Sequence, residues 1–292
     1  MAASQKPLSP RSKNDLAKNA RSTSRATIGV FDSGVGGLTV LRALLDRIPN
    51  ADYLYFGDTA RLPYGSKSAA TVAHYAVGAV QYLQAQGADL LVIACNTATA
   101  LALDEIKAAA GVPVIGVVEP GAEAAAAASR NHKVVVIGTE ATISSHAYRR
   151  ALEGRKVTVR EKACPLFVPL VEEGWAEHPV TEQVAKIYLS EAFADDAGDS
   201  DADVLVLGCT HYPLIKPLLR RVAPEHIAIV DSAESTAQAV ARQLHVEPVE
   251  SGRRDLPALK FFATDSAEKF RTMGTRFLGL PVRDVLHVDL KE

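Results

Sequence analysis

The sequence predicts an α/β protein with mostly parallel sheets, arranged as two pseudo-symmetric units. From residue 27 onward, short apolar strand patterns alternate with helix patterns, which is typical of parallel sheets covered by helices on both faces. Two segments resemble each other: residues 89–97 read Asp-Leu-Leu-Val-Ile-Ala-Cys-Asn-Thr, and residues 203–211 read Asp-Val-Leu-Val-Leu-Gly-Cys-Thr-His. Hydrophobic residues make up 48% of the 292 residues, enough for the cores of two ordinary domains. We therefore expect a duplicated α/β unit.

The first unit is expected at residues 27–118. Residues 233–292 are expected to return to it, because two units of equal size leave this last stretch unplaced elsewhere. Apolar runs predict strands, and longer segments with helical periodicity predict helices. The expected strands are residues 26–31, 51–56, 90–94, 114–117 and 258–263, and the expected helices are residues 38–47, 68–86, 98–110, 235–244 and 267–278. A loop at residues 57–67 contains Pro63-Tyr64-Gly65.

The second unit is expected at residues 119–232, because Pro120 and the alanine-rich run after it indicate the beginning of a new unit. Residues 165–174 are expected to form a loop or a short helix, and residues 195–201 an acidic surface turn. The expected strands are residues 134–137, 157–161, 204–207 and 227–230, and the expected helices are residues 142–153, 180–194 and 214–222.

Residues 1–26 differ from the rest of the chain. They contain six basic residues, one acidic residue and frequent Ser and Pro, which predicts a disordered basic tail. A regulatory or nucleic-acid-contacting arm and a transit peptide remain alternatives. The tail has no apolar core of the kind that secretory signals contain. The chain also has no apolar stretch of the roughly 18–20 residues that a membrane span needs.

The overall composition points away from several classes of partner and site. Lys and Arg total 32 against 34 Asp and Glu, so the charge balance gives no reason to expect nucleic acid or an anionic membrane as partner. Three cysteines cannot form a disulfide framework, and the absence of Cys-x-x-Cys argues against a zinc knuckle. Unpaired thiols fit a reducing compartment, so we expect a cytoplasmic protein.

The two repeated cysteines, Cys95 and Cys209, are the candidate catalytic residues. Each follows a buried strand and precedes a helix, so a helix N-terminus can stabilise its thiolate. A thiolate and a thiol on opposite faces of a carbon atom can remove a proton from one face and return one to the other. Such a pair inverts a stereocentre. Cys164 has no counterpart in the repeat, and we expect it to be a core residue.

Polar residues accompany both thiols. Asp32 follows the first strand and can assist Cys95, and His211 lies two residues after Cys209 and can tune or relay its proton. Gly34-Val35-Gly36-Gly37 matches neither G-x-G-x-x-G nor a P-loop, and its amides suit a small anion. Neutral donors that suit a small carboxylate-bearing ligand are Ser33, Asn96, Thr97, Thr139, Thr142 and Thr210.

Several motifs in order resemble those of glutamate racemases, in the cofactor-independent aspartate/glutamate racemase superfamily. The resemblance spans roughly residues 27–280. The motifs are Ile28-Gly-Val-Phe-Asp-Ser-Gly-Val-Gly-Gly-Leu-Thr-Val40, Phe56-Gly-Asp-Thr-Ala-Arg-Leu-Pro-Tyr-Gly65, Ala94-Cys-Asn-Thr-Ala98, Cys164-Pro-Leu-Phe-Val-Pro-Leu-Val-Glu172, Gly208-Cys-Thr-His-Tyr-Pro-Leu214, and Lys269-Phe270 leading into Arg276-Phe-Leu-Gly279.

The resemblance implies two α/β domains with the active site at their interface, and racemisation of glutamate for peptidoglycan synthesis. It implies that Cys95 and Cys209 are the two bases, that Asp32 and His211 assist them, and that Glu172 acts beside the histidine. It implies no pyridoxal phosphate and no metal, glutamate as the small-molecule partner, and leaves a homodimer open. The implied substrate-binding residues are Asp32, Ser33, Tyr64, Gly65, Asn96, Thr97, Thr139, Thr142, Thr210 and His211.

Two other functions remain open. The first is racemisation of aspartate or another small amino acid, although aspartate racemases usually carry an acidic residue after the second cysteine, where this chain has Thr210-His211. The second is a binding or regulatory protein on the same fold, such as a gyrase inhibitor. Retention of both cysteines argues against a purely non-catalytic role, and the basic tail is the one feature that favours nucleic acid.

Overall fold

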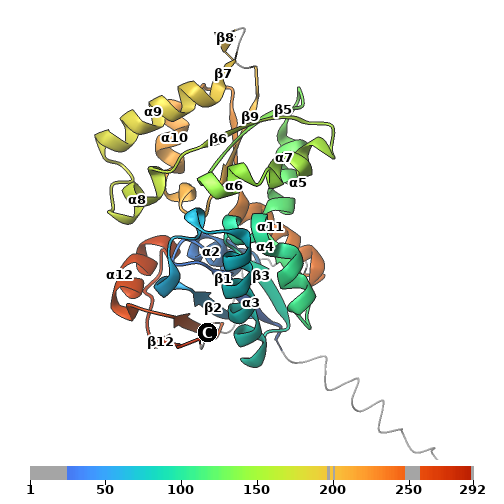
Figure 1. The fold of residues 1–292 in the computed structure, drawn as a ribbon, viewed down its shortest axis with the longest axis vertical. Coiled ribbons are helices and arrows are strands. Elements are labelled where there is room, and N and C mark those ends of the chain that lie inside the picture. Colours follow the sequence, from blue (N-terminus) through green and yellow to red (C-terminus); the bar gives the residue numbers. More distant parts are fainter. Residues whose placement is uncertain (1–24, 196–197, 200, 247–256, 291–292) are drawn as a thin grey trace, which may run out of the picture.

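The computed structural model describes residues 25–195, 198–199, 201–246 and 257–290. They form two α/β units, one above the other in Figure 1, so the predicted fold class is confirmed. The basic tail predicted at residues 1–26 lies outside the described residues except for its last two. Within the described ranges, no helix is long and apolar enough to cross a membrane.

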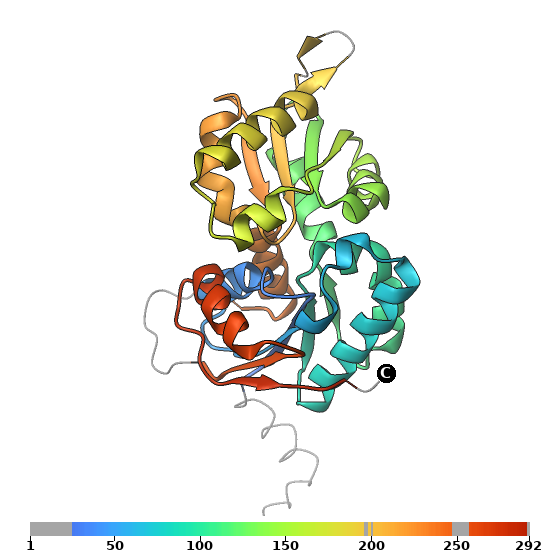
Figure 2. The same cartoon turned by 60° about the vertical axis from the view of Figure 1, so that its left-hand side comes forward.

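The first unit contains a six-stranded sheet in the order β12-β11-β2-β1-β3-β4. All of its neighbouring strands are parallel. Its two C-terminal strands lie at one edge, beside β2, and Figure 2 shows this red segment against the lower unit. The strands are β1 (Thr27–Asp32), β2 (Asp52–Gly57), β3 (Leu90–Ile93), β4 (Val114–Gly116), β11 (Leu259–Ala263) and β12 (Val285–His287).

The second unit contains a four-stranded parallel sheet in the order β10-β9-β5-β6. A separate two-stranded antiparallel pair, β7 and β8, extends from it. These strands are β5 (Lys133–Gly138), β6 (Thr158–Ala163), β7 (Ala194–Asp195), β8 (Gly198–Asp199), β9 (Val204–Gly208) and β10 (Ala228–Asp231).

Helices cover both faces of each large sheet. The described helices are α2 (Leu38–Arg47), α3 (Ala69–Ala85), α4 (Asn96–Ala109), α5 (Val118–Ala128), α6 (Glu140–Ser144), α7 (Ala147–Glu153), α8 (Phe167–Glu172), α9 (Pro179–Phe193), α10 (Lys216–Val222), α11 (Ser232–Gln243) and α12 (Ala267–Leu278), with 3-10 helices η1 (Thr59–Arg61), η2 (Tyr64–Ser66) and η3 (Tyr212–Ile215). Alternate strand residues point to opposite faces, as Val30 and Phe31 do in β1. One buried apolar cluster runs from the first sheet into the second, so the two units share a core.

Several elements differ from the sequence-based expectation. The alanine-rich run forms α5, and the helix expected over residues 142–153 is two short helices, because His146 between them has a left-handed φ of 53°. Strands β7 and β8 occupy part of the expected acidic turn, and β12 was not predicted. Helix α4 begins at Asn96 rather than at residue 98, which makes Cys95 its N-cap.

The strand order gives each large sheet one topological switch point. In the first sheet, β2 and β3 lie on either side of β1, and in the second sheet β6 and β9 lie on either side of β5. Ligands of open α/β sheets bind beyond the carboxyl ends of strands at such points. Cys95 follows β3, and Thr139 and Cys209 follow the paired ends of β5 and β9, so each sheet places one cysteine at its switch point.

Candidate active site

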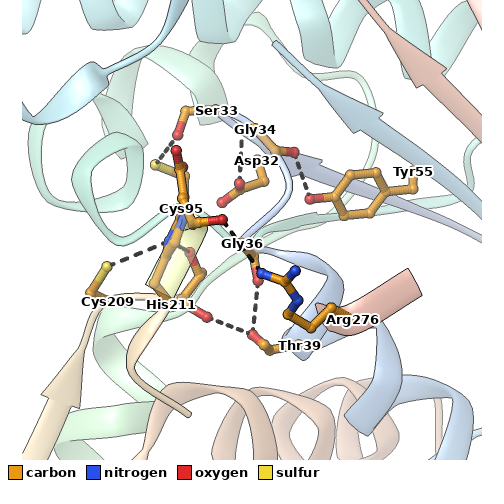
Figure 3. Close-up of polar contacts among 12 residues, drawn as sticks. Asp32, Ser33, Gly34, Gly36, Thr39, Tyr55, Cys95, Cys209, His211 and Arg276 are labelled. Carbon is orange, nitrogen blue, oxygen red and sulfur yellow. Dashed lines mark hydrogen bonds and ion pairs between the residues drawn. The ribbon is translucent and has the colours of Figure 1, made fainter. Parts of the chain in front are cut away.

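The two thiols lie at equivalent places in the two units and are equally buried, each 5% exposed. Cys95 caps α4, and its sulfur accepts a hydrogen bond from the amide of Ala98 at 3.4 Å. Cys209 directly follows the fully buried strand β9 and precedes η3. Figure 3 shows that each thiol has its own polar neighbour, Ser33 for Cys95 and His211 for Cys209.

We call the surroundings of each thiol a half-site. The half-site of Cys95 favours the protonated form of this thiol. The Cys95 thiol donates to Ser33 Oγ at 3.5 Å. Burial and the nearby Asp32 carboxyl raise the pKa of Cys95 to about 12, so this side chain is a thiol at neutral pH. Burial also raises the pKa of Asp32, against the opposing charge of His211. Asp32 Oδ2 accepts from the Gly34 amide at 2.9 Å, whereas buried Oδ1 has no hydrogen-bond partner among the described residues.

The half-site around Cys209 carries a positive charge. His211 Nδ1 lies 3.9 Å from Cys209 Sγ, and Nε2 lies 3.1 Å from Glu172 Oε1. Burial lowers the pKa of His211, but hydrogen bonds to Cys209 and Glu172 outweigh it and raise this pKa to about 10. The hydrogen bond from His211 in turn lowers the pKa of Glu172. At neutral pH, His211 is therefore an imidazolium that donates in both directions.

This charge predicts a pH-dependent stability. The pKa of His211 is about 10 in the folded protein, against roughly 6.5 in an unfolded chain. Its contribution is therefore complete below about pH 6.5 and is lost as the pH rises through about 10. Denaturant unfolding of the wild type and of His211→Asn should show a stability difference that shrinks over this range. A difference that stays constant with pH would contradict a charged His211.

A close contact between the glycine-rich loop and the second unit joins the half-sites. A Cβ atom at Gly36 would lie 2.3 Å from Thr210 Oγ1 and 2.6 Å from the His211 ring. The Thr39 hydroxyl also links the two units, because it lies 2.9 Å from the Gly36 carbonyl and 3.0 Å from the Thr210 carbonyl, both acceptors (Figure 3). Gly36 is therefore the residue that lets the loop approach His211.

Three threonine hydroxyls from both units form a second cluster. Thr97 Oγ1 lies 3.1 Å from Thr139 Oγ1 and 3.3 Å from Thr142 Oγ1, and the last two hydroxyls are 2.9 Å apart. Thr139 caps α6 as Cys95 caps α4. Gly65 also reaches this cluster, because a Cβ atom there would lie 3.5 Å from Thr139. The cluster supplies neutral hydrogen-bond donors at the junction of the two units.

The polar ends of two predicted substrate-binding residues, Tyr64 and Asn96, form hydrogen bonds to other side chains of the protein. The Tyr64 hydroxyl donates to buried Asp58 at 2.7 Å. Asn96 Oδ1 accepts from the Tyr148 hydroxyl at 2.7 Å, and Asn96 Nδ2 donates to Ser232 at 3.4 Å. The structure thus brings together the thiols, Asp32, Ser33, His211, Glu172 and the threonines, while the polar ends of Tyr64 and Asn96 contact neighbouring side chains.

Three further residues at this site were not predicted from the sequence: Asp58, Thr39 and Tyr148. Asp58 is fully buried and also accepts from Arg61 at 3.0 Å and from Thr264 at 2.8 Å, which anchors the loop of Tyr64. Its place after strand β2 was a usable signal, since acceptors at strand ends lie on the site's edge. Thr39 and Tyr148 lie within helices and gave no comparable signal. Among the described residues, no group of three or more His, Cys, Asp or Glu side chains is arranged to hold a metal ion.

Known proteins with similar sequences and folds identify the family of this chain. A family model described as Asp/Glu/Hydantoin racemase matches residues 36–240. A glutamate racemase from Koribacter versatilis (strain Ellin345) is 59% identical over 290 residues, covering 92% of this chain and 99% of that protein. The solved structure of glutamate racemase isoform RacE1 from Bacillus anthracis superposes with a TM-score of 0.83 at 36% identity, covering 91% of this chain and 98% of that one. The glutamate racemase of Francisella tularensis, solved in complex with D-glutamate, gives a TM-score of 0.81 at 35% identity with the same coverage.

Proposed function

The chain belongs to the Asp/Glu/Hydantoin racemase family and is an amino-acid racemase, and we propose that it interconverts L- and D-glutamate without a cofactor, using Cys95 and Cys209 as its two bases. The observation that carries this proposal is the placement of one buried thiol at each switch point, beside neighbours of opposite character. Cys95 has a hydroxyl and a carboxyl beside it, and Cys209 has an imidazolium.

The two environments suit the two halves of a proton exchange. The His211 imidazolium donates toward the Cys209 sulfur and so favours negative charge there, whereas Cys95 keeps its proton. In one direction the Cys209 thiolate takes the proton from Cα and becomes a thiol. Cys95 gives its proton to the opposite face of Cα and becomes a thiolate. The reverse reaction exchanges these roles, which restores both protonation states.

We propose that the remaining polar groups hold glutamate between the thiols. The unpartnered Oδ1 of Asp32 suits the substrate ammonium group, since a cation offsets the cost of an ionised buried carboxyl. The hydroxyls of Thr97, Thr139 and Thr142 suit a carboxylate, which accepts hydrogen bonds only. Relatives named glutamate racemases, one of them solved in complex with D-glutamate, support glutamate over aspartate.

Incubation with L-glutamate in deuterium oxide, with no added cofactor, tests the reaction and its substrate. A two-base transfer incorporates solvent deuterium at Cα of the D-glutamate that forms, because the second thiol carries an exchanged proton. We expect L-aspartate to turn over at least about 100-fold more slowly. Comparable rates with aspartate would overturn the choice of substrate, and inversion without deuterium at Cα would overturn the mechanism.

Two further expectations accompany this function. We propose domain boundaries at residues 27–118 plus 233–292 and at residues 119–232, since the strands of the two large sheets divide along these limits. We also propose that the D-glutamate supplies peptidoglycan synthesis, which the resemblance of the motifs to glutamate racemases supports.

A further inference from the structure

Tyr148 lies on α7 of the second unit, and its hydroxyl contacts the first residue of α4. Its side chain is fully buried, and its hydroxyl donates to Asn96 Oδ1 at 2.7 Å. Asn96 is 3% exposed, follows Cys95 directly and is the first residue of the helix that Cys95 caps. The hydroxyl therefore holds the chain next to the first thiol.

The ring of the same tyrosine packs against the chain next to the second thiol. A Cβ atom at Gly208, the residue before Cys209, would lie 3.1 Å from Tyr148 Cε2. A Cβ atom at Gly121 on α5 would lie 3.2 Å from both Cε1 and the hydroxyl oxygen. Real Cβ atoms rarely approach so closely, so the two glycines leave the space that this ring occupies.

Asn96 extends this contact to the point where the chain passes between the units. Its Nδ2 donates to Ser232 Oγ at 3.4 Å. Ser232 is the first residue of α11, directly after the last strand of the second sheet, and α11 packs on α2 of the first unit. Tyr148, Asn96 and Ser232 thus form a buried polar chain from three helices of the two units.

We propose that Tyr148 is a positioning residue that sets the relative placement of the two thiols, with its hydroxyl acting through Asn96 on Cys95 and its ring acting through Gly208 on Cys209. The inference rests on the proposed function, because two bases must face opposite sides of one Cα atom. Misplacement of a reacting group by about 1 Å costs roughly 100-fold in rate. A residue that touches the neighbours of both thiols is well placed to prevent such a displacement.

The substitution Tyr148→Phe tests the hydroxyl while keeping the ring. It leaves the buried Asn96 Oδ1 without its donor. We expect kcat to fall about tenfold with KM changed by less than about threefold, since the groups proposed to bind glutamate remain. Tyr53→Phe is the matched control, because this buried hydroxyl donates to the Leu44 and Ile48 carbonyls within the first unit. We expect it to lower the melting temperature but to keep kcat within about twofold.

A double-mutant cycle separates positioning from general stability. If Tyr148 acts through Asn96, Tyr148→Phe has little further effect on kcat in an Asn96→Ala background, so the two substitutions are not additive. Equal fold losses in both backgrounds, or a Tyr148→Phe variant as active as Tyr53→Phe, would overturn the proposal. The wild-type rate is measured first with glutamate and aspartate. An inactive wild type would overturn the proposed function together with this inference, whereas an active wild type with an unaffected variant would overturn the inference alone.

Discussion

Replacing Cys95 or Cys209 with alanine is expected to lower kcat/KM by about 10⁴-fold, because each substitution removes the group that transfers a proton on one face of Cα. The loss should be equal in both directions, since the two enantiomers have equal free energies in water. Serine at either position should lose most activity as well, because a hydroxyl is a far weaker base than a thiolate. The measurement is the rate of inversion from each enantiomer, followed by circular dichroism.

Cys164→Ala provides the control for these two substitutions. Cys164 is a third buried thiol, fully inaccessible, and its sulfur contacts the Lys162 carbonyl at 3.7 Å. It follows β6, the edge strand of the second sheet, rather than a strand at a switch point. We expect its loss to reduce stability but to preserve turnover within about threefold. Full activity in Cys95→Ala or Cys209→Ala would disprove the two-base mechanism.

The second large effect is expected for Gly36→Ala. The added methyl carbon would lie 2.3 Å from Thr210 Oγ1 and 2.6 Å from His211 Nδ1, so one of these side chains must move. Either movement disturbs the contact between the loop and the half-site of Cys209. We expect kcat/KM to fall about 100-fold, the size of effect that a displacement of about 1 Å produces.

Gly78→Ala is the matched control for this glycine. Gly78 lies inside α3, where an added Cβ atom would meet only Leu290 at 3.9 Å, an ordinary contact. Alanine there should stabilise the helix by about 0.5–1 kcal/mol and leave kcat/KM unchanged. If Gly36→Ala retained the activity of Gly78→Ala, the close contact with His211 would have no catalytic importance.

Much of the fold was predictable because its strands are buried on both faces. The runs before Cys95 and Cys209 are uninterrupted apolar segments, and both form fully buried parallel strands. The break between α6 and α7 was not predictable, since it depends on the left-handed backbone of a single residue, His146. Strand β12 is only three residues long, too short to show a periodic pattern, and it forms by pairing with β11.

The candidate site, like the fold, contains some residues that the sequence indicates and others that it does not. Cys95, Cys209, Asp32 and His211 stand out in the sequence because each lies at or just after the end of an apolar strand. Tyr148 does not, because it is one buried position in a short helix, and the role that we propose for it comes from the contacts of its hydroxyl and its ring. Asn96 was predicted to bind substrate, and its side chain is engaged by Tyr148 and Ser232.

The alternation of strands and helices, the repeat and the four candidate reactive side chains are predictable from the sequence alone, because they follow from local periodicity and from residue chemistry. The difference between the two thiols, in contrast, comes from tertiary contacts. Burial beside Asp32 keeps Cys95 protonated, and the hydrogen bond that His211 donates to Glu172 on α8 helps to keep His211 charged beside Cys209. Desolvation and the placement of charges depend on residues distant in sequence, so no local pattern encodes them.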